Sequence, residues 1–419
     1  MSRTADLCVT VRGEGNLFQS GESEDREGGV DLDSDNITII NGQLVTPFEI
    51  VPGTIVIEKG MITYVGPHSG APAGGPIWDA QGAYVTPGLI DTHVHGGGGG
   101  DVMDGTKDAL DVMAKTFAKY GTTAFVPTTL TASHQGILDC IGAVKEAAEQ
   151  GTPGAQVIGI HLEGPFINEE KKGAQNPKYI RPPDLQELEK IREEAGPLLK
   201  TVTLAPEIPG ALQAIKLLRS WGVTVSIGHT DAAFDEVMQA QRWGANLICH
   251  TFNGMRGLHH RDPGVVGAAL TCDGFFAELI CDGIHVHPAA MQIVLKSKGI
   301  DKVVLITDTI QAMDLADGRY DFGGLEIEVS EGAARLTSGA LAGSTLSMAK
   351  AVQNAVKWLG VSVAEAIRMA SLNPAQVVNV AHRKGSLQVG KDGDLAVFDE
   401  YINPLATIVR GKIVYEAER

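Results

Sequence analysis

The sequence predicts an α/β fold in which a (β/α)8 barrel carries a small β-sandwich domain built from the N- and C-terminal segments. Three observations predict this architecture. Eight apolar, strand-like runs alternate with helical stretches over about 250–300 residues, the usual size of such a barrel. Short β patterns recur near both ends of the chain. Histidine, aspartate and glutamate side chains follow the apolar runs, which is where the active sites of such barrels lie.

The first 36 residues differ in composition from the rest of the chain. They hold nine acidic and three basic residues, a net charge of −6 within a chain total of −17, and show almost no hydrophobic periodicity. We interpret residues 1–36 as an acidic, disordered extension. The excess of acidic residues argues against binding to nucleic acid or to an anionic membrane surface, because both select basic proteins.

The small β domain is predicted from two segments, 37–86 and 384–419. Because an isolated β-hairpin is marginally stable, we expect the two segments to assemble into one unit. Their short β runs, several of them separated by turn signals that contain glycine, lie at 37–40, 53–57, 61–65, 395–398, 406–409 and 413–415.

The predicted barrel occupies residues 87–383, and helical stretches such as Asp184–Ala195 and Phe234–Trp243 separate its strands. A doubly wound parallel sheet is the main alternative, but only a run of glycines, Gly96–Gly100, follows the first strand, without the G-x-G-x-x-G pattern. The eight strand-like runs are Leu89–His93, Thr122–Val126, Val157–Leu162, Thr201–Leu204, Val223–Ile227, Asn246–Cys249, Phe276–Ile280 and Val303–Ile306.

Imidazole and carboxylate side chains stand at the ends of several of these runs. Glu163, His229 and His250 each end a different run, so a barrel brings all three to one rim. Two imidazoles and a carboxylate are the ligand set of a catalytic zinc-type site, and Fe²⁺, Mn²⁺ or Co²⁺ also fits it. His93 and His95 are two residues apart in a strand and share one face, so they are further candidate ligands, although buried structural histidines would give the same pattern.

Asp308 follows the eighth run. By itself it is equally consistent with a helix N-cap or a salt bridge at the barrel rim. Beside the predicted metal cluster, a carboxylate can take a proton from a water molecule and later deliver it to a leaving group. We therefore interpret Asp308 as the catalytic acid and base.

Two loop-like stretches are candidates for binding the rest of a substrate. Arg261, together with His259, His260 and His285, is suited to an anionic group such as a phosphate, although a loop arginine is more often simply solvated. The stretch Leu341–Ser344 is interpreted as a hydrogen-bonding loop that leads into a helix starting at Thr345.

These residues together resemble the amidohydrolase superfamily, and within it the branch that deacetylates N-acetyl-D-glucosamine 6-phosphate. The resemblance covers the chain from about residue 37 to its C-terminus. It is carried by Pro87-Gly88-Leu89-Ile90-Asp91-Thr92-His93-Val94-His95-Gly96, His161-Leu162-Glu163-Gly164-Pro165-Phe166, Gly228-His229-Thr230, His250-Thr251-Phe252-Asn253-Gly254-Met255, Leu341-Ala342-Gly343-Ser344 and Lys391-Asp392-Gly393-Asp394-Leu395-Ala396-Val397.

The resemblance implies a hydrolase of a linear amide in amino-sugar metabolism, with one or two divalent cations in each subunit. Glu163, His229 and His250 would bind the main cation, and His93 and His95 would join Glu163 at a second, weaker site. Arg261 would reach the active site of a neighbouring subunit, which implies a homodimer. The substrate contacts implied are Ala174, Asn253, Gly254, Arg261, Asp282, Gly283, Ile284, His285, Leu341, Ala342 and Gly343.

One position departs from the pattern: Gln175 stands where some members have a histidine that polarises the substrate carbonyl. Its amide can donate the same hydrogen bond but cannot carry a proton at neutral pH. The resemblance leaves open which metal is bound and whether the substrate is the glucosamine or the galactosamine epimer.

Two other functions remain as alternatives. A hydrolase of cyclic amides on the same fold usually holds two metals with a carboxylated lysine at the fourth strand, where this chain has Ala205-Pro206-Glu207. A non-catalytic scaffold would be expected to lose ligands, and all candidate ligands are present. The five cysteines contain no Cys-x-x-Cys pair, and no apolar run is long enough to span a membrane, so we expect a cytoplasmic protein.

Overall fold

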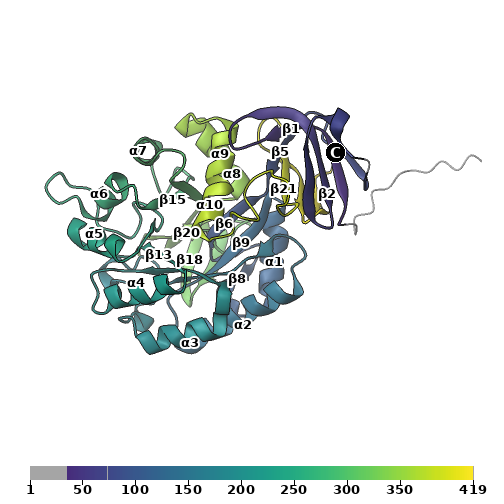
Figure 1. The fold of residues 1–419 in the computed structure, drawn as a ribbon. Helices are drawn as coiled ribbons and strands as arrows, with labels where there is room; N and C mark the ends of the chain where they lie inside the picture. The colour runs from purple at the N-terminus through teal and green to yellow at the C-terminus, as the bar shows by residue number, and fades with distance from the viewer. Residues whose placement is uncertain (1–34, 73, 419) are drawn as a thin grey trace, which may run out of the picture.

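The structure is a computed structural model that describes residues 35–418 with the exception of residue 73. The acidic extension predicted over residues 1–36 therefore lies almost wholly outside the described residues. Over the described part, the chain forms a barrel with helices around it and a separate sheet at one side of the barrel (Figure 1).

The barrel consists of eight parallel strands, as predicted. Its first strand pairs with the second, and the six that follow pair in sequence order. The barrel is nearly closed between its first and last strands, where the Asp308 backbone N–H donates to the carbonyl of His93 at 2.9 Å. The strands are β6 (Leu89–Val94), β9 (Thr122–Thr129), β11 (Ile160–Glu163), β12 (Leu199–Leu204), β13 (Thr224–Ile227), β14 (Leu247–Ile248), β15 (Phe276–Ile280) and β16 (Val303–Ile306).

These strands form because their side chains are apolar and often β-branched on both faces. In β16 the sequence Val-Val-Leu-Ile is fully buried, with one face inside the barrel and the other under the helices. Parallel strands covered on both sides require such continuous apolar runs, which is why the runs were recognisable in the sequence.

Helices cover the outside of the barrel. In α3 (Leu185–Ala195), Asp184 caps the N-terminus by accepting from the Gln186 backbone N–H, and Leu188 and Ile191 are buried in the main hydrophobic cluster. The others are α1 (Lys107–Ala118), α2 (His134–Gln150), α4 (Ala211–Ser220), α5 (Phe234–Arg242), α6 (Gly264–Thr271), α7 (Pro288–Lys298), α8 (Met348–Asn354), α9 (Val363–Ala370) and α10 (Leu372–Val377). No helix over the described residues is both long and apolar enough to cross a membrane.

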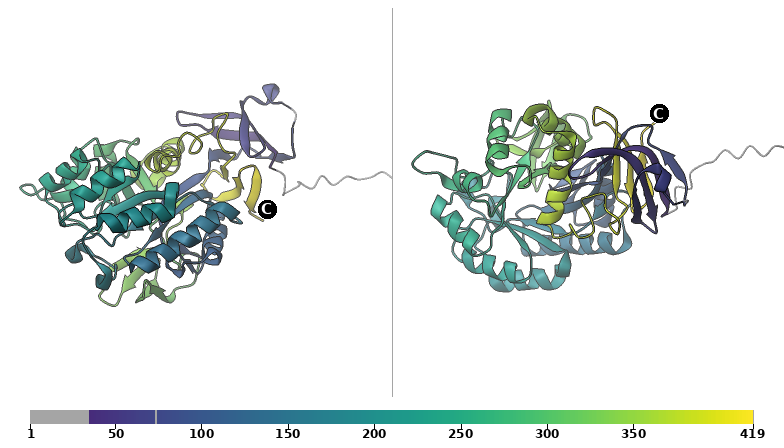
Figure 2. Two further views of the ribbon diagram at one scale, coloured as in Figure 1. Left: turned by 60° about the horizontal axis from the view of Figure 1, so that its bottom comes forward. Right: turned by 45° about the horizontal axis from the view of Figure 1, so that its top comes forward.

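The two ends of the chain build one eight-stranded sheet, which confirms the predicted second unit. The N- and C-terminal parts join where β5 pairs antiparallel with β21, with Pro87 opposite Leu395, so strands from both ends of the chain share one sheet (Figure 2). The strands are β1 (Ile37–Val45), β2 (Ile50–Glu58), β3 (Met61–Gly66), β4 (Ile77–Asp79), β5 (Tyr84–Pro87), β21 (Leu395–Phe398), β22 (Pro404–Val409) and β23 (Lys412–Glu416).

A four-stranded antiparallel sheet between β16 and α8 was not predicted. It consists of β17 (Gly318–Phe322), β18 (Leu325–Ser330), β19 (Ala333–Leu336) and β20 (Leu341–Ser344). Its apolar face, which includes Phe322, Ile327 and Ala334, packs with Leu130 and Ala174 from the barrel loops in one hydrophobic cluster. The interpretation of 341–344 as a loop before a helix at Thr345 is therefore wrong, because these residues form a strand and α8 begins at Met348, capped by Ser347.

The remaining elements are short. The short strands are β7 (Gly96–Gly97), β8 (Gly100–Asp101) and β10 (Gln156–Val157). The short helical turns are η1 (His68–Gly70), η2 (Val102–Asp104), η3 (Glu169–Lys171), η4 (Pro177–Tyr179), η5 (Gly196–Leu198) and η6 (Ala355–Leu359).

Candidate active site

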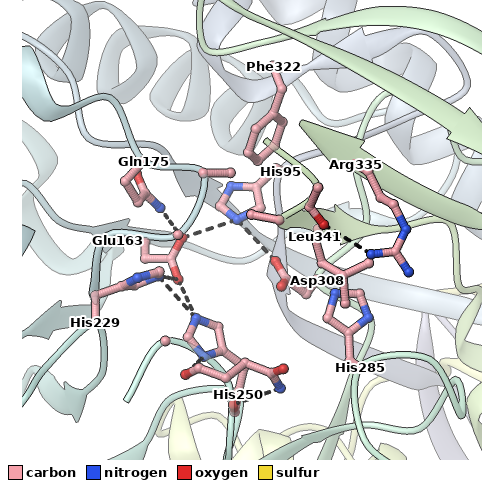
Figure 3. A pocket seen from close by; sticks show the side chains of 17 residues that line it. His95, Glu163, Gln175, His229, His250, His285, Asp308, Phe322, Arg335 and Leu341 are labelled. Atoms are coloured by element: carbon pink, nitrogen blue, oxygen red, sulfur yellow. Dashed lines mark hydrogen bonds and ion pairs between the residues drawn. The ribbon is translucent and has the colours of Figure 1, made fainter. Parts of the chain in front are cut away.

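The candidate site is a cavity of about 430 Å³ at the carboxyl ends of the barrel strands. Glu163 is the last residue of β11, and His229, His250 and Asp308 each lie two residues beyond the end of β13, β14 and β16. Residues up to 145 positions apart in the chain, Glu163 and Asp308, thus meet at one rim (Figure 3). The barrel topology, in which every parallel strand ends on the same side, produces this convergence.

The backbone bends sharply at three of these residues. His229, His250 and Asp308 have φ angles of 46°, 21° and 52°. Residues other than glycine rarely adopt such positive φ angles. Such a conformation costs energy and persists where the surroundings impose it, most often at functional sites. Here it turns each side chain from the strand direction into the cavity.

The first group of candidate ligands is Glu163, His229 and His250. The Nδ1 atoms of His229 and His250 lie 2.9 and 3.1 Å from the backbone carbonyls of Lys171 and Asn253. A carbonyl only accepts, so each Nδ1 carries the proton and each Nε2 of a neutral ring carries a lone pair. The two Nε2 atoms lie 3.2 Å apart and 3.0–3.2 Å from Oε1 of Glu163, so three electron-rich atoms converge.

The second group is His93, His95 and Glu163. Nδ1 of His93 faces Oε2 of Glu278 at 3.2 Å, and Nδ1 of His95 faces the Thr128 carbonyl at 3.0 Å. Both Nε2 atoms therefore point inward, each 3.3 Å from an oxygen of Glu163. Ligand atoms within each group lie no more than 4.8 Å apart, and all these residues are buried.

This donor chemistry fits a divalent cation. Converging lone pairs and carboxylate oxygens repel one another unless a positive charge lies between them, and the outer hydrogen bonds hold each imidazole in the tautomer that a metal requires. Imidazole nitrogen and carboxylate oxygen without thiolate are ligands that zinc, iron, manganese and cobalt accept.

The shifted pKa values of Glu163 and His95 also indicate that this site stabilises positive charge. Burial raises the pKa of the Glu163 carboxyl, but His93 and His229 outweigh burial and hold it well below its ordinary value. Burial lowers the pKa of His95, but its interactions with Asp308 and Glu163 raise it to about 9. In the absence of a metal ion, protons on the imidazoles supply the positive charge that the carboxylates attract.

Asp308 lies between the metal-ligand groups and the open part of the cavity. Its Oδ1 atom is 3.2 Å from Nε2 of His95 and 3.5 Å from Nε2 of His93. Burial raises its pKa, but these two imidazoles lower it to about 2, so the carboxylate is ionised at neutral pH. An ionised carboxylate that lines the cavity beside a cation site is placed to accept a proton from a bound water molecule.

Gln175 is fixed in one orientation by its neighbours. Its Oε1 accepts from the Thr131 backbone N–H, and its Nε2 donates to Oε2 of Glu163, both at 2.6 Å. The side chain is buried and lines the cavity, so its amide holds the Glu163 carboxylate in place. The Gln175 amide N–H, which was expected to donate to a substrate carbonyl, therefore donates to Glu163 in this structure.

The structure places some of the predicted substrate contacts on the cavity wall and leaves others behind it. Asp282 is behind the wall and positions His285, because it accepts from the His285 backbone N–H at 2.8 Å and faces Nδ1 of its ring at 2.6 Å. Lining residues among those predicted are Ala174, Asn253, Gly254, His285, Leu341 and Gly343. Predicted residues that do not line it are Arg261, Asp282, Gly283, Ile284 and Ala342.

Arg261 lies outside this cavity. It is exposed in the loop before α6, and its guanidinium faces the ring of His260 at 2.8 Å. Within one chain it therefore has no contact with the cavity.

Sequence reasoning missed Phe322 and Arg335 on the wall, because both belong to the unpredicted sheet. It also missed the smaller lining residues Gly173, Gly339 and Ala340. The ring of Phe322 packs edge-on against His95 with centroids 5.6 Å apart. The alternation of apolar and acidic residues in Leu325-Glu326-Ile327-Glu328-Val329 and the Gly323-Gly324 turn are signals that could have revealed this sheet.

Comparisons with known proteins agree with this geometry. The profile of the amidohydrolase family matches residues 84–414. The N-acetylglucosamine-6-phosphate deacetylases of Vibrio furnissii and Bacillus subtilis are 43% and 38% identical, covering 80% and 91% of this chain and 83% and 98% of their own. The N-acetylgalactosamine-6-phosphate deacetylase of Escherichia coli is 43% identical over 78% of this chain and 87% of its own.

Solved structures give the same result. The N-acetylglucosamine-6-phosphate deacetylase of Pasteurella multocida superimposes with a TM-score of 0.86 at 31% identity, covering 90% of this chain and 99% of its own. A mutant of the Mycobacterium smegmatis enzyme in complex with N-acetyl-D-glucosamine-6-phosphate superimposes with a TM-score of 0.85, also at 31% identity and with the same coverage.

Proposed function

The chain belongs to the amidohydrolase family, and from this premise we propose that it hydrolyses the acetamide of N-acetyl-D-glucosamine 6-phosphate to D-glucosamine 6-phosphate and acetate, in amino-sugar metabolism. The observation that carries the proposal is the convergence of Glu163, His229 and His250 beside the ionised Asp308 in one cavity. The relatives and solved structures that cover most of the chain bear the same activity in their names.

The main cation would be held by Glu163, His229 and His250. A second, weaker cation would be held by His93, His95 and Glu163, since these atoms form the other converging group. We propose zinc, because two histidines and a carboxylate, with a fourth position left open, are a usual ligand set of catalytic zinc. The outer partners Glu278 and Thr128 keep His93 and His95 turned toward this second site.

A bound divalent cation would polarise the acetamide carbonyl and lower the pKa of a water molecule to near 7. Asp308 would then accept a proton from the attacking water at Oδ1 or Oδ2. The same carboxyl would return that proton to the nitrogen as the C–N bond breaks, so that glucosamine 6-phosphate leaves as a neutral amine. The acetic acid formed with it would release its remaining proton to give acetate. Gln175 would hold the Glu163 carboxylate during these steps through its hydrogen bonds to Thr131 and Glu163, both at 2.6 Å.

The sugar phosphate would occupy the part of the cavity lined by Ala174, Asn253, Gly254, His285 and Leu341. Arg261 is exposed and lies outside the cavity of its own chain, so a second subunit is the way in which it would reach a phosphate. We therefore propose a homodimer in which each subunit contributes Arg261 to the active site of its neighbour.

A second candidate substrate is the galactosamine epimer. The Escherichia coli N-acetylgalactosamine-6-phosphate deacetylase is as similar to this chain as the Vibrio furnissii enzyme, at 43% identity. A cyclic amide is disfavoured, because Ala205-Pro206-Glu207 follows β12 and offers no lysine to bridge two metals.

Acetate release and metal content test the proposal together. Purified protein would be incubated with N-acetylglucosamine 6-phosphate, N-acetylgalactosamine 6-phosphate, their unphosphorylated forms and a cyclic amide such as dihydroorotate, before and after metal removal. We expect acetate from a phosphorylated sugar, loss of activity on chelation, and recovery with zinc. Hydrolysis of the cyclic amide alone, or no hydrolysis by metal-loaded protein, would contradict the proposal.

A further inference from the structure

We propose that Arg335 binds the phosphate of the substrate from within the same subunit, so that the small sheet β17–β20 determines specificity for phosphorylated sugars. This inference rests on the proposed function and assigns a residue of the same site. Arg335 lies on β19, is exposed, and is one of the residues that line the cavity holding the metal ligands.

Strand pairing places Arg335 on the exposed face of the small sheet, next to Leu341. In β19, Ala334 is buried in the hydrophobic cluster beneath the sheet, so the next residue, Arg335, points to the opposite face. Arg335 is also directly opposite Leu341 of β20, and residues paired in this way have side chains on the same face. Leu341 lines the cavity, and so does Arg335.

Arg335 is paired across the sheet with Glu328 of β18, but the two side chains form no ion pair. Nη1 of Arg335 donates to the Gly339 carbonyl at 3.1 Å, which holds the side chain over the turn between β19 and β20. Among the described residues, no ion pair involves Arg335, whereas Arg319 on the same sheet is 3.4 Å from Oε1 of Glu326. Arg335 therefore keeps most of its N–H donors for a ligand.

Arg335 is also the one lysine or arginine on the cavity wall, within the part of the chain that the structure describes. The other nitrogen group on that side is His285, whose Nδ1 is engaged by Asp282 at 2.6 Å. In Figure 3, Arg335 and His285 lie on one side of the cavity and Glu163 and His229 on the other. A sugar whose acetamide faces the metal ligands would thus direct its distant phosphate to the side of Arg335.

A phosphate monoester dianion is well matched to this position, because a guanidinium offers two parallel N–H donors to two phosphate oxygens. Arg261 of a partner subunit would add a second cation in the dimer proposed above. The two assignments are independent, since Arg335 needs no second chain to reach the cavity.

The test is the steady-state kinetics of Arg335→Ala with phosphorylated and unphosphorylated N-acetylglucosamine. We expect KM for the phosphorylated sugar to rise about 10- to 100-fold, the usual effect of losing a charge-assisted hydrogen bond. We expect kcat to stay within about threefold and kcat/KM for the free sugar to stay unchanged, because the reacting groups are untouched. Arg335→Lys, which keeps the charge but not the paired donors, should recover part of the affinity.

Arg319→Ala is the matched control, because Arg319 is an exposed arginine of the same sheet and does not line this cavity. It should leave KM within about twofold. An unchanged KM in Arg335→Ala, or an equal loss with the free sugar, would overturn the assignment while the proposed function stands.

Binding of glucosamine 6-phosphate and of glucosamine, measured by calorimetry, separates this assignment from the activity itself. Weaker binding of the phosphorylated sugar alone to Arg335→Ala supports it, and equal binding to wild type and variant overturns it. Absence of acetate release by wild-type protein would contradict the proposed function instead.

Discussion

At the scale of single residues, the site depends on which nitrogen of each histidine carries the proton. His93, His95, His229 and His250 all direct Nδ1 to an outer acceptor, three of them a backbone carbonyl and one the carboxylate of Glu278. Every Nε2 atom is thereby left to face Glu163. Backbone carbonyls cannot lose this role by titration, so they fix the tautomer more firmly than side chains would.

Asp308→Asn should lose nearly all turnover without loss of metal. The amide occupies the same space but cannot accept a proton, so kcat should fall by about 10²- to 10⁴-fold, the usual contribution of general acid–base catalysis. Acetate release and elemental analysis of the same sample check both parts. Turnover near that of wild type would remove Asp308 from the proposed reaction.

His229→Ala should lose the main cation, because the Nε2 atom that completes the group with Glu163 and His250 disappears. Metal content measured by elemental analysis should fall well below that of wild type. His285→Ala is the control, since it removes a histidine of the same cavity whose Nδ1 is engaged by Asp282, and it should keep its metal. Equal metal content in both variants would contradict the ligand assignment.

At the scale of elements, the last barrel strand and the small sheet are tied together at the active site. Asp308 donates its backbone N–H to His93, and its carbonyl accepts from Ser344 of β20 at 2.7 Å. Gly343 next to Ser344 has φ of 60°, and a Cβ there would lie 2.8 Å from the Asp308 carbonyl and 2.5 Å from Ile310. The backbone of Asp308 is therefore fixed by hydrogen bonds to β6 through its N–H and to β20 through its carbonyl.

Gly343→Ala should lower kcat strongly, because the added methyl group must displace the backbone of Asp308. The accompanying loss of thermal stability should be small by comparison. A displacement of about 1 Å is enough to lower kcat by about 10²-fold, while metal content stays unchanged. Gly332→Ala is the control: φ is 77°, and a Cβ there would meet nothing closer than Thr345 at 3.8 Å. The control should show only the stability cost of a left-handed alanine, measured by thermal unfolding, with normal kcat.

At the scale of the whole molecule, protonated imidazoles balance the carboxylates at this rim when no metal is bound, so the stability of the metal-depleted protein should depend on pH. The pKa of His95 is about 9 in the folded protein against 6.5 ordinarily, and that of Asp308 is about 2 against 3.8. The stabilisation from His95 is complete below pH 6.5 and is lost as the pH rises through 9. That from Asp308 is present above pH 3.8 and is lost as the pH falls through 2.

The metal-depleted protein should therefore be less stable at pH 9 than at pH 6, by about 1–3 kcal/mol. Zinc should remove this loss, because metal binding to neutral imidazoles strengthens as the pH rises. Thermal unfolding of chelated and zinc-loaded protein across this range is the measurement. His95→Gln should show a smaller loss when chelated, and a chelated wild type that gains stability from pH 6 to 9 would contradict the expectation.

Much of the architecture was predictable from the sequence for a physical reason. Barrel strands are buried on both faces, so each of the eight appears as a continuous apolar run, and all eight are confirmed. The small sheet was missed because its strands are half-exposed, and their pairing depends on distant contacts with Leu130 and Ala174. Phe322 and Arg335 were missed with it.

By itself, the sequence determined the fold class and the family, because hydrophobic periodicity and motif spacing are local properties of the chain. It also placed Glu163, His229, His250 and Asp308 at strand ends, which in a barrel means one rim. Only the tertiary structure decided how their atoms meet, which imidazole nitrogen faces inward and that Arg335 belongs to the same cavity. These properties depend on contacts between segments far apart in the chain, and no local pattern specifies such contacts.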